Sequence, residues 1–367
     1  MSLVRSNVKR VTRRVPSTPR ERPLVTVVVP AYNYGRFLTD CARSVLTQRD
    51  VDVRLLIVDD CSTDDTPRRT AELVASDARV SVIRHEHNRG HIPSVNEGFE
   101  RVESPYVVKL DADDLLAPGS LARATALLEA HPEVGFVYGR PRHFRGSVPR
   151  PAESAARSWT IWSGRDWVAR RCRSGNNVIS QPEVVMRTAL LRRAAPIRRE
   201  LPHTSDLHLW MQLGSMGDVG RINGPVQGYY RVHDASMQRT THSGVLFDLR
   251  ARRDAFDSVF AAEAGALPGA AELHDTARRT LAAAALDRTC SDVDRGRTGV
   301  DSLEDVVAFA LETWPAARQL PEWAALERRR SFGAERAPRH PRFFARAVAR
   351  RASVEAARWR WARTGEL

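Results

Sequence analysis

From residue 24 to about residue 139, short runs of consecutive apolar residues alternate with longer segments in which apolar residues recur every three or four positions. The apolar runs are rich in β-branched residues, which is typical of strands buried on both faces of a sheet. The periodic segments are typical of amphipathic helices. The expected strands are 24–30, 53–60, 80–85, 106–111 and 134–139, and the expected helices are 35–48, 62–76, 91–102 and 120–131.

This alternation predicts an α/β fold in which helices cover both faces of a mostly parallel sheet. In such sheets, ligands bind at the edge where the parallel strands have their carboxyl ends. Unusual polar sequences follow the first four strands, namely PAYN, DDCSTDD, HNRG and DADD. A single edge of the expected sheet therefore collects most of the candidate chemistry.

The pattern changes in the second half of the chain. Residues 140–200 are basic and rich in tryptophan and glycine, without a clear period. A helix is expected at 205–217, and a short strand with a polar turn is expected within 224–237. From about residue 245 to residue 363 the pattern is helical.

These changes suggest three segments. Residues 1–22 are basic, poor in apolar residues and interrupted by prolines, so we expect a flexible leader there. Residues 23–245 are expected to form the α/β domain. Residues 246–367 are expected to form a helical C-terminal region.

The composition is that of an ordinary protein with a hydrophobic core, at 42% hydrophobic and 28% charged residues. No apolar run approaches the roughly 18 residues needed to span a bilayer. The basic N-terminal segment lacks the apolar stretch of a secretory signal, so a cytoplasmic location is the default expectation. The four cysteines lie far apart, which argues against a disulfide framework and a structural zinc site.

The net charge of +13 raises the question of a nucleic-acid or membrane partner. The arginines are concentrated in residues 5–22 and 328–363, whereas residues 24–120 carry both signs in similar amounts. Because no recognisable nucleic-acid-binding module accompanies these arginines, we expect no nucleic-acid partner.

The last segment of the chain combines its arginines with aromatic residues, which suits an amphipathic helix on the inner face of an anionic membrane. The aromatic residues are Phe343, Phe344, Trp359 and Trp361. Arg351 and Glu355 interrupt the apolar side of such a helix. A solvated basic helix packed on the domain is therefore the favoured alternative to peripheral membrane contact.

Three carboxylates, Asp111, Asp113 and Asp114, lie within four positions after the fourth expected strand. They repel one another unless a cation or a set of hydrogen-bond donors lies between them. In isolation, this sequence also suits a solvated turn with a helix-capping acid.

The segments VVVPAYN, LLIVDDCSTDDT, HNRGHIPSVNEGF and VKLDADDLLAPGSL, in this order and spacing, closely resemble glycosyltransferase family 2. The later segments SDLHLWMQL and YYRVHDASM resemble the acceptor half of the same domain. The resemblance implies the GT-A fold, which is Rossmann-like, and an inverting enzyme that uses a nucleoside diphosphate sugar. It also divides the domain into a nucleotide-sugar-binding half, residues 23–138, and an acceptor-binding half, residues 139–245.

The resemblance implies that the first two loops bind the donor nucleotide. Pro30, Ala31 and Tyr32 would form a wall of the base and ribose site, with core packing as the alternative for Tyr32. Asp60, the second acid of its pair, would contact the nucleobase, with capping of the following helix by Asp59 or Asp60 as the alternative. Cys61 stands where the family often has glycine, which eases a tight turn. A hydroxyl of the next residues, Ser62 or Thr63, is expected to cap the following helix.

The third loop also matches the donor-binding pattern of the family. Asn88, Gly90 and Asn96 occupy its expected positions. Val95 replaces the usual arginine, which is a departure from the pattern. Arg89 and His91 are candidate substitutes for that arginine.

The fourth loop contains a DXD motif, Asp111-Ala-Asp113. The resemblance assigns Asp111 and Asp113 to the donor ribose, sugar and diphosphate, and Asp113 and Asp114 to the metal. Mg²⁺ or Mn²⁺ is the expected cofactor, since hard cations prefer oxygen ligands and can act as a Lewis acid on a departing diphosphate. His233 is a further candidate metal ligand, with a structural role equally open, and Arg231 could neutralise phosphate charge.

An inverting sugar transfer needs a base that accepts the proton of the acceptor hydroxyl. Asp206 stands at the position where the family places this base, and helix capping is the alternative role. His203 is a weaker candidate base. Trp159, Trp162 and Trp167 could stack on an acceptor sugar, but burial in the core is the favoured interpretation.

The sequence therefore predicts a metal-dependent inverting glycosyltransferase that uses a UDP- or dTDP-type sugar. The acceptor would be a hydroxyl of a saccharide, a lipid-linked glycan or a secondary metabolite. The alternatives are a nucleotide-sugar-binding protein without catalysis and, less favoured, a basic nucleic-acid-binding protein. A nucleotidyltransferase is disfavoured because PAYNYGRF is not the glycine-rich basic loop that such enzymes carry after the first strand.

Overall fold

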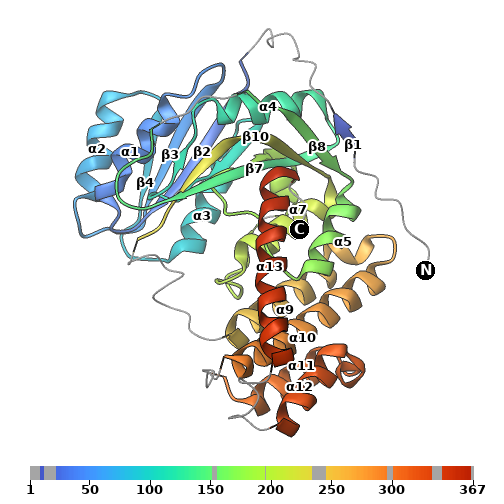
Figure 1. The fold of residues 1–367 in the computed structure, drawn as a ribbon. Coiled ribbons are helices and arrows are strands. Elements are labelled where there is room, and N and C mark those ends of the chain that lie inside the picture. The colour runs from blue at the N-terminus through green and yellow to red at the C-terminus, as the bar shows by residue number, and fades with distance from the viewer. Residues whose placement is uncertain are drawn as a thin grey trace. The chain divides into compact units, whose positions relative to one another are not determined.

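The computed structural model describes residues 9–11, 22–150, 155–194, 196–233, 245–295, 301–332 and 341–364. The chain divides into two compact units. The first unit comprises Met1–Trp167 and Val178–His233 and is an α/β unit, and the second comprises Val168–Asn177 and Asp234–Leu367 and is helical (Figure 1).

The first unit is built on one sheet, which contains ten strands within the described residues. The strands are β1 Lys9–Val11, β2 Leu24–Ala31, β3 Asp52–Asp59, β4 Val80–Arg84, β5 Tyr106–Lys109, β6 Leu115–Leu116, β7 Val134–Phe144, β8 Ser158–Trp162, β9 Val185–Arg187 and β10 Asp218–Arg231. Their order in the sheet is β1-β8-β10-β7-β9-β5-β2-β3-β4, and β6 pairs with β10.

Parallel pairing dominates the part of the sheet that carries the candidate site. The strands β4, β3, β2 and β5 are parallel neighbours. The short strand β9 runs antiparallel to both β5 and β7, and β10 is parallel to β7. The carboxyl ends of β2, β3, β4, β5, β7 and β10 therefore lie at the same edge of the sheet, which we call the carboxyl edge.

The helices of the first unit cover both faces of this sheet (Figure 1). They are α1 Gly35–Leu46, α2 Thr66–Ser76, α3 His91–Glu100, α4 Ser120–Ala130, α6 Thr188–Ala194 and α7 Ser205–Met216, and α5 Gly164–Ser174 continues into the second unit. Apolar residues of α1 and α4 pack in one cluster with Val27 and Leu55. On the other face, Gly98 of α3 lies so close to Val28 that an added Cβ would be 2.3 Å from Cγ1 of that valine.

The predicted α/β fold is confirmed, and the five expected strands and four expected helices all form. Several strands depart from the expectation. Strand β7 continues five residues beyond the expected end, to Phe144, and β9 lies in the segment that had no clear pattern. Strand β10 has 14 residues instead of being a short strand.

Residues 9–11 depart from the expected flexible leader. Lys9–Val11 form β1 and pair antiparallel with Trp159–Ile161 of β8. The backbone groups at the edge of β8 provide the hydrogen-bonding partners, and such edge pairing requires little apolar content in the added strand. Residues 1–8 and 12–21 of the expected leader lie outside the described residues.

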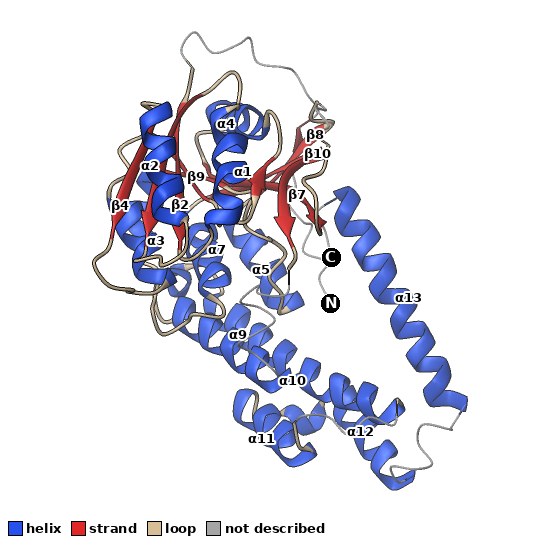
Figure 2. Ribbon diagram, turned by 90° about the vertical axis from the view of Figure 1, so that its left-hand side faces the viewer, coloured by secondary structure: helices blue, strands red, loops and turns tan. Residues whose placement is uncertain are grey.

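The second unit is helical, as predicted for the C-terminal extension (Figure 2). Its helices are α9 Val245–Phe260, α10 Ala270–Asp294, α11 Leu303–Thr313, α12 Pro321–Phe332 and α13 Pro341–Thr364. The long helix α10 contributes Ala282 and Leu286 to an apolar cluster with Ala310 of α11 and Leu326 of α12. No helix in the described ranges is both long enough and apolar enough to span a bilayer.

Candidate active site

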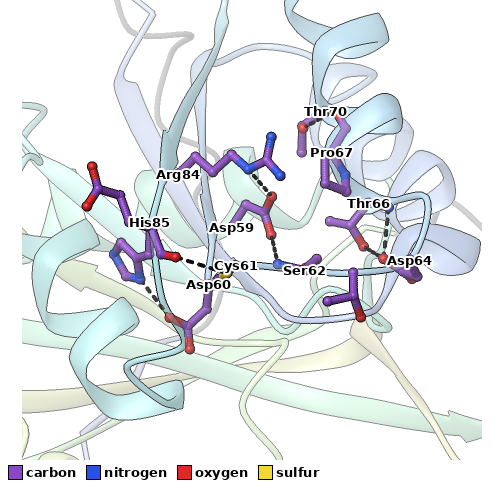
Figure 3. A network of polar contacts seen from close by, with 12 residues as sticks. Asp59, Asp60, Cys61, Ser62, Asp64, Thr66, Pro67, Thr70, Arg84 and His85 are labelled. Atoms are coloured by element: carbon purple, nitrogen blue, oxygen red, sulfur yellow. Dashed lines mark hydrogen bonds and ion pairs between the residues drawn. The ribbon is translucent and has the colours of Figure 1, made fainter.

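Asp59 and Asp60, at the end of β3, have different environments (Figure 3). Asp59 is fully buried, and its Oδ1 atom accepts a hydrogen bond of 3.0 Å from the backbone N–H of Ser62. Its Oδ2 atom lies 3.6 Å from Nε of Arg84 on β4. The side chain of Asp59 therefore stabilises the turn that follows β3.

Asp60 is held by three hydrogen bonds from the segment that follows β4. Its Oδ1 atom contacts Nδ1 of His85 at 2.7 Å and accepts the backbone N–H of Arg89 at 2.8 Å. Its Oδ2 atom accepts the backbone N–H of Gly90 at 2.8 Å. Burial alone would raise the pKa of Asp60, but these hydrogen bonds outweigh burial and hold the pKa below its usual value. Asp60 is therefore a fixed carboxylate.

A second layer of side chains fixes the partners of Asp60. Nε2 of His85 contacts Oε2 of Glu97 at 3.0 Å, and Nη1 of Arg89 donates to the same oxygen at 3.0 Å. Since Glu97 lies on α3, this network joins the ends of β3 and β4 to that helix. Asp60 could be identified from the sequence, whereas His85 and Glu97 were not, although the sequence HEHNRG places a histidine directly after β4.

Cys61 has a φ of 63°, in the left-handed region. This backbone conformation explains why a glycine is common at its position in the family that the sequence resembles, since glycine adopts positive φ without a steric penalty. The thiol of Cys61 contacts the backbone oxygen of Glu86 at 3.3 Å. The turn therefore keeps its shape with a non-glycine residue.

The loops after β2 and β3 are joined by Asn33 and Asp64. Oδ1 of Asn33, whose φ is 58°, accepts the backbone N–H groups of Thr63 and Asp64 at 2.8 and 3.2 Å. The Asp64 carboxylate accepts the N–H groups of Thr66 at 2.9 Å and Gly35 at 3.1 Å. The expected capping of α2 by Ser62 or Thr63 is wrong, because α2 begins at Thr66, its N-cap residue is Asp65, and the N–H of Thr66 bonds to the Asp64 carboxylate.

The other residues expected at the donor site are placed as follows. Pro30 and Ala31 are the buried last residues of β2, and Tyr32 is 44% exposed beside them, which disfavours core packing for Tyr32. Asn88 is exposed, and Gly90 adopts a φ of 92° as it donates to Asp60.

Asn96 makes a structural link between two segments far apart in the sequence. Its Nδ2 group donates to the carbonyl of Ile197 at 2.9 Å, and its Oδ1 accepts the N–H of the same residue at 2.8 Å. Ile197 belongs to the segment that leads into α7. Asn96 thus attaches that segment to α3.

The DXD loop, residues 111–114, lies between β5 and β6. Each of its three acids has a different interaction partner. Oδ1 of Asp111 is 2.7 Å from Nζ of Lys109. Oδ2 of Asp113 contacts Nε2 of His233 at 2.9 Å. Asp114 is 1% exposed, and its Oδ1 accepts the backbone N–H of Arg231 at 2.8 Å. Asp111 and Asp113 remain partly accessible, whereas Asp114 joins the loop to β10.

The acids of this loop influence one another's protonation. Burial and the repulsion of Asp111 raise the pKa of Asp113, and burial with the repulsion of Asp113 raises the pKa of Asp114 further. For Asp111, burial is outweighed by the nearby positive charge of Lys109 and by His91, so its pKa is lowered. The loop therefore contains more negative charge than its protein neighbours compensate, which fits the binding of a cation.

In the described part of the chain, no group of three or more His, Cys, Asp and Glu side chains is arranged to hold a metal ion. Asp113 and His233, two of the residues expected to bind the metal, are in direct contact. A pair suits Mg²⁺ or Mn²⁺ bound together with substrate phosphates, because Mg²⁺ usually takes only one or two carboxylates from the protein. The donor set therefore fits a divalent cation that binds with its substrate.

Asp206 lies in the first turn of α7, where its Oδ1 accepts the backbone N–H of Leu207 at 2.7 Å. The N-cap residue of the helix is Thr204 and not Asp206. Burial is the largest cause that raises the pKa of Asp206; the charge of Lys109 lowers it and that of Asp111 raises it. Because the charges of Lys109 and Asp111 both affect the pKa of Asp206, the Asp206 carboxyl lies near the DXD loop.

Three further residues at this edge were not identified from the sequence. Lys109 is buried at the end of an apolar strand, which is an unusual position for a lysine and was an available signal. Burial raises the pKa of Tyr230 on β10, and the negative charges of the three DXD-loop acids and of Asp206 raise it further. Glu183, also buried, precedes β9, and only tertiary contacts reveal its position.

The three tryptophans considered for acceptor stacking are in the core. Trp159, Trp162 and Trp167 are 7%, 1% and 1% exposed. Burial, the favoured interpretation, is therefore confirmed for this group. Val95, at the position of the missing arginine, is also buried, at 1% exposure.

Comparison with known proteins adds to this geometry. Residues 26–191 match the model of the family described as Glycosyl transferase family 2. This part of the chain belongs to glycosyl transferase family 2. The match includes the first three loops of the carboxyl edge and the DXD loop, and it confirms the resemblance seen in the sequence.

Two curated relatives illustrate the extent of the similarity. TuaG of Bacillus subtilis, a putative teichuronic acid biosynthesis glycosyltransferase, is 39% identical over 93 residues, which are 25% of this chain and 37% of TuaG. Glycosyltransferase GlyG of Streptococcus pneumoniae is 32% identical over 93 residues, which are 25% of this chain and 31% of GlyG. The chain therefore spans less than two thirds of the length of either relative.

Among solved structures, residues 1–349 of S. aureus TarS in complex with UDP-GlcNAc are similar over a longer range. The TM-score is 0.59 at 18% identity, and the similarity covers 86% of this chain and 89% of that one. This likeness confirms the GT-A fold of the family 2 segment.

Proposed function

We propose that this protein transfers a sugar from a nucleoside diphosphate sugar to an acceptor hydroxyl, with inversion at the anomeric carbon and with a divalent metal ion. The observation that carries the proposal is the meeting of three groups at the carboxyl edge. These groups are the fixed carboxylate of Asp60, the DXD loop, and Asp206 within electrostatic range of that loop. Membership of family 2 supports the same reaction class.

The hydrogen bonds of Asp60 favour a uracil or thymine base in the donor. A carboxylate oxygen has about two lone-pair sites. Both sites of Oδ1 are used by His85 and Arg89, whereas Oδ2 accepts only the N–H of Gly90. One acceptor site remains, which suits the single imide N–H of uracil or thymine. A UDP-type donor is further supported by TarS, which is described in complexes with UDP-GlcNAc and with UDP.

We assign the diphosphate and the metal to the DXD loop. Asp113 with His233 would hold Mg²⁺ or Mn²⁺, and Asp111 would face the ribose or sugar. When bound, the metal would act as a Lewis acid on the departing diphosphate. Asp114 would position the loop, because its carboxylate is buried against the backbone of Arg231.

In the proposed mechanism, Asp206 accepts the proton of the acceptor hydroxyl as the hydroxyl oxygen attacks the anomeric carbon. The bond between that carbon and the diphosphate oxygen breaks on the opposite face. A raised pKa makes the carboxylate of Asp206 a stronger proton acceptor. Residues 139–233 would form the acceptor-binding side of the active site. The acceptor would be a saccharide, a lipid-linked glycan or a secondary metabolite.

Thermal shift measurements with nucleoside diphosphates and their sugars, with and without Mn²⁺, test the donor assignment. We expect UDP or dTDP compounds to raise the melting temperature most. We expect Mn²⁺ to increase this shift, because Asp113 with His233 would hold the cation and the cation would neutralise diphosphate charge. Equal shifts with GDP or ADP compounds would contradict the assignment of Asp60. No shift across the panel would contradict the proposed function itself.

The substitution Asp206→Asn tests the base. We expect normal folding and normal nucleotide binding, with turnover about 10²–10⁴-fold lower, because general base catalysis typically contributes that factor. Product formation with the identified donor is the measurement, and Glu304→Gln, an exposed acid in the first turn of α11, is the matched control. If the wild-type protein binds nucleotide sugars but transfers none to any acceptor, the alternative of a binding protein without catalysis holds.

A further inference from the structure

The end of β7 and the residues after it form an exposed basic segment, residues 140–150, which we call the basic rim. It contains Arg140, Arg142, His143, Arg145 and Arg150. No acidic residue occurs between Glu133 and Glu153. The rim is therefore a local excess of positive charge within the family 2 unit, separate from the arginine-rich ends of the chain.

The register of the sheet places this rim at the carboxyl edge. Arg142 pairs with Tyr229, His143 with Tyr230 and Phe144 with Arg231, in the parallel ladder between β7 and β10. Both strands have their carboxyl ends there, next to the DXD loop. The rim thus lies beside the candidate active site and not on a remote surface.

Arg231 connects the rim to the DXD loop through three contacts. Its Nη1 group donates to the carbonyl of Gly146 at 3.2 Å, and its Nε group donates to the carbonyl of Asp113 at 2.8 Å. Its guanidinium carbon lies 4.6 Å from the ring centre of Phe144. These contacts hold the rim in a fixed position relative to the acids.

The rim faces the acceptor side of the site. The ring of His143 lies 4.9 Å from that of Tyr230, and its Nε2 atom is 3.4 Å from Oγ of Ser180. Tyr230 is the residue whose pKa is raised by burial and by the DXD acids together with Asp206. The described contacts of the rim are therefore with β10, with Ser180 and, through Arg231, with the DXD loop, and none links it to Asp60 or to the hydrogen-bonding partners of Asp60.

Among the described residues, the exposed arginines of the rim have no acidic partner. Arg142, Arg145 and Arg150 are exposed, and none forms an ion pair or a side-chain hydrogen bond with another described residue. By contrast, Arg68 and Arg79 on the same unit pair with acids at 2.6 and 2.7 Å. Unpaired like charges next to each other repel, and an anionic ligand relieves this repulsion.

We infer that the basic rim binds the acceptor, and that the acceptor is a glycan chain carrying repeated negative charges, either phosphodiester or uronate groups. This inference rests on the proposed transfer reaction and specifies the substrate class of the acceptor side. Arginine suits both groups because its guanidinium matches the geometry of phosphate and carboxylate oxygens. The rim would hold the chain so that one of its hydroxyls reaches Asp206.

The experiment measures binding of fluorescein-labelled oligogalacturonate and of labelled polyphosphate, with labelled maltooligosaccharide as the neutral probe. The test variant is Arg142→Gln with Arg145→Gln. The control is Arg49→Gln with Arg101→Gln, which removes the same charge from exposed arginines in the loops after α1 and α3, at the opposite edge of the sheet. The control separates a local effect from a change in net charge.

We expect the wild type and the control to bind at least one anionic probe and not the neutral one. The test variant should bind that probe about tenfold more weakly, and the slope of log K against log salt should fall by about one to two. Its melting-temperature shift with UDP or dTDP compounds should not change. Equal affinity in the test variant and the wild type would overturn the inference, as would an equal loss in the control.

Binding by the wild type to phosphatidylglycerol vesicles but to neither anionic probe would also overturn it. Failure of the proposed function has a different signature. If the rim binds polyanions but the wild type shows no shift with any nucleotide, then the transfer reaction is contradicted while the polyanion site remains.

Discussion

Glu183 is a carboxyl group enclosed by protein at the carboxyl edge of the sheet. It is 2% exposed, and its Oε1 atom accepts the backbone N–H of Ser180 at 2.9 Å. Its Oε2 atom has no hydrogen-bond partner among the described residues. Burial is the main cause that raises the pKa of Glu183 from 4.5 to about 7; Asp206 adds to the rise, and Arg221 opposes it. The fold therefore disfavours the ionised form.

A pH-dependent gain in stability is expected for Glu183→Gln. Below the pKa of the unfolded state, which is near 4.5, the carboxyl is protonated in both the folded and the unfolded state. Its burial then does not lower the free energy of unfolding through ionisation. As pH rises towards 7, the unfolded state loses its proton first, so the wild type loses stability, on the order of 3 kcal/mol in total. The variant should exceed the wild type by about this amount at pH 8 and nearly match it at pH 4.5.

Urea unfolding at the two pH values measures this difference, with Glu100→Gln, an exposed glutamate of α3, as the control. A difference between variant and wild type that is the same at both pH values would show that Glu183 does not change its protonation on unfolding. An equal pH dependence in the control would show that the effect is not specific to the buried carboxyl.

Single residues of the site differ in how far the sequence could identify them. Asp60 and Asp113 lie in motifs that directly follow strands, so their place at the carboxyl edge could be predicted. His85 and Lys109 also lie at strand ends, but their roles depend on partners that are 25 and 2 residues away and become evident only from the contacts. Glu183 precedes a strand of three residues, which no hydrophobic period indicates.

At the scale of elements, the segment that leads into α7 decides where Asp206 lies. This segment is attached to α3 by the two hydrogen bonds between Asn96 and the backbone of Ile197, at 2.9 and 2.8 Å. The resemblance assigned Asn96 to donor binding, whereas these bonds favour a role in positioning the catalytic helix. The two roles predict different kinetic effects.

The substitution Asn96→Ala separates these roles. We expect unchanged affinity for UDP or dTDP compounds, a free energy of unfolding lower by about 1–3 kcal/mol, and lower turnover, because the two backbone groups of Ile197 lose their partner. Nucleotide titration and kcat are the measurements. The control is Glu100→Ala, at an exposed residue of the same helix. A loss of nucleotide affinity with normal turnover would support the donor-binding role instead.

Regular elements between residues 24 and 139 could be predicted because each has a clear period of its own. The strands of 140–233 could not, since β9 has only three residues and β10 is held by pairing with β6, β7 and β8. The strand β1 has no apolar run, and its pairing depends on the free edge of β8. Elements that are stabilised mainly by their neighbours carry little signal in their own sequence.

At the scale of the whole molecule, the last helix, α13, is strongly basic and has two distinct sides. Phe343 is buried, and Arg350, seven residues later, pairs with Asp287 of α10 at 2.9 Å. Val348 and Trp359, eleven residues apart and thus on one side of the helix, are 54% and 61% exposed. Residues 341–364 contain seven arginines and one glutamate.

This arrangement predicts peripheral binding to anionic membranes. Each arginine near an anionic surface contributes about 1 kcal/mol, and exposed apolar side chains add to the affinity by insertion at the interface. The protein should therefore cosediment with vesicles containing phosphatidylglycerol and not with pure phosphatidylcholine. Val348→Ser with Trp359→Ser should weaken this binding about tenfold, whereas Val74→Ser with Val82→Ser, at exposed valines of the first unit, should not. Equal sedimentation with both lipids, or no effect of the α13 substitutions, would support the alternative of a solvated helix packed on its own unit.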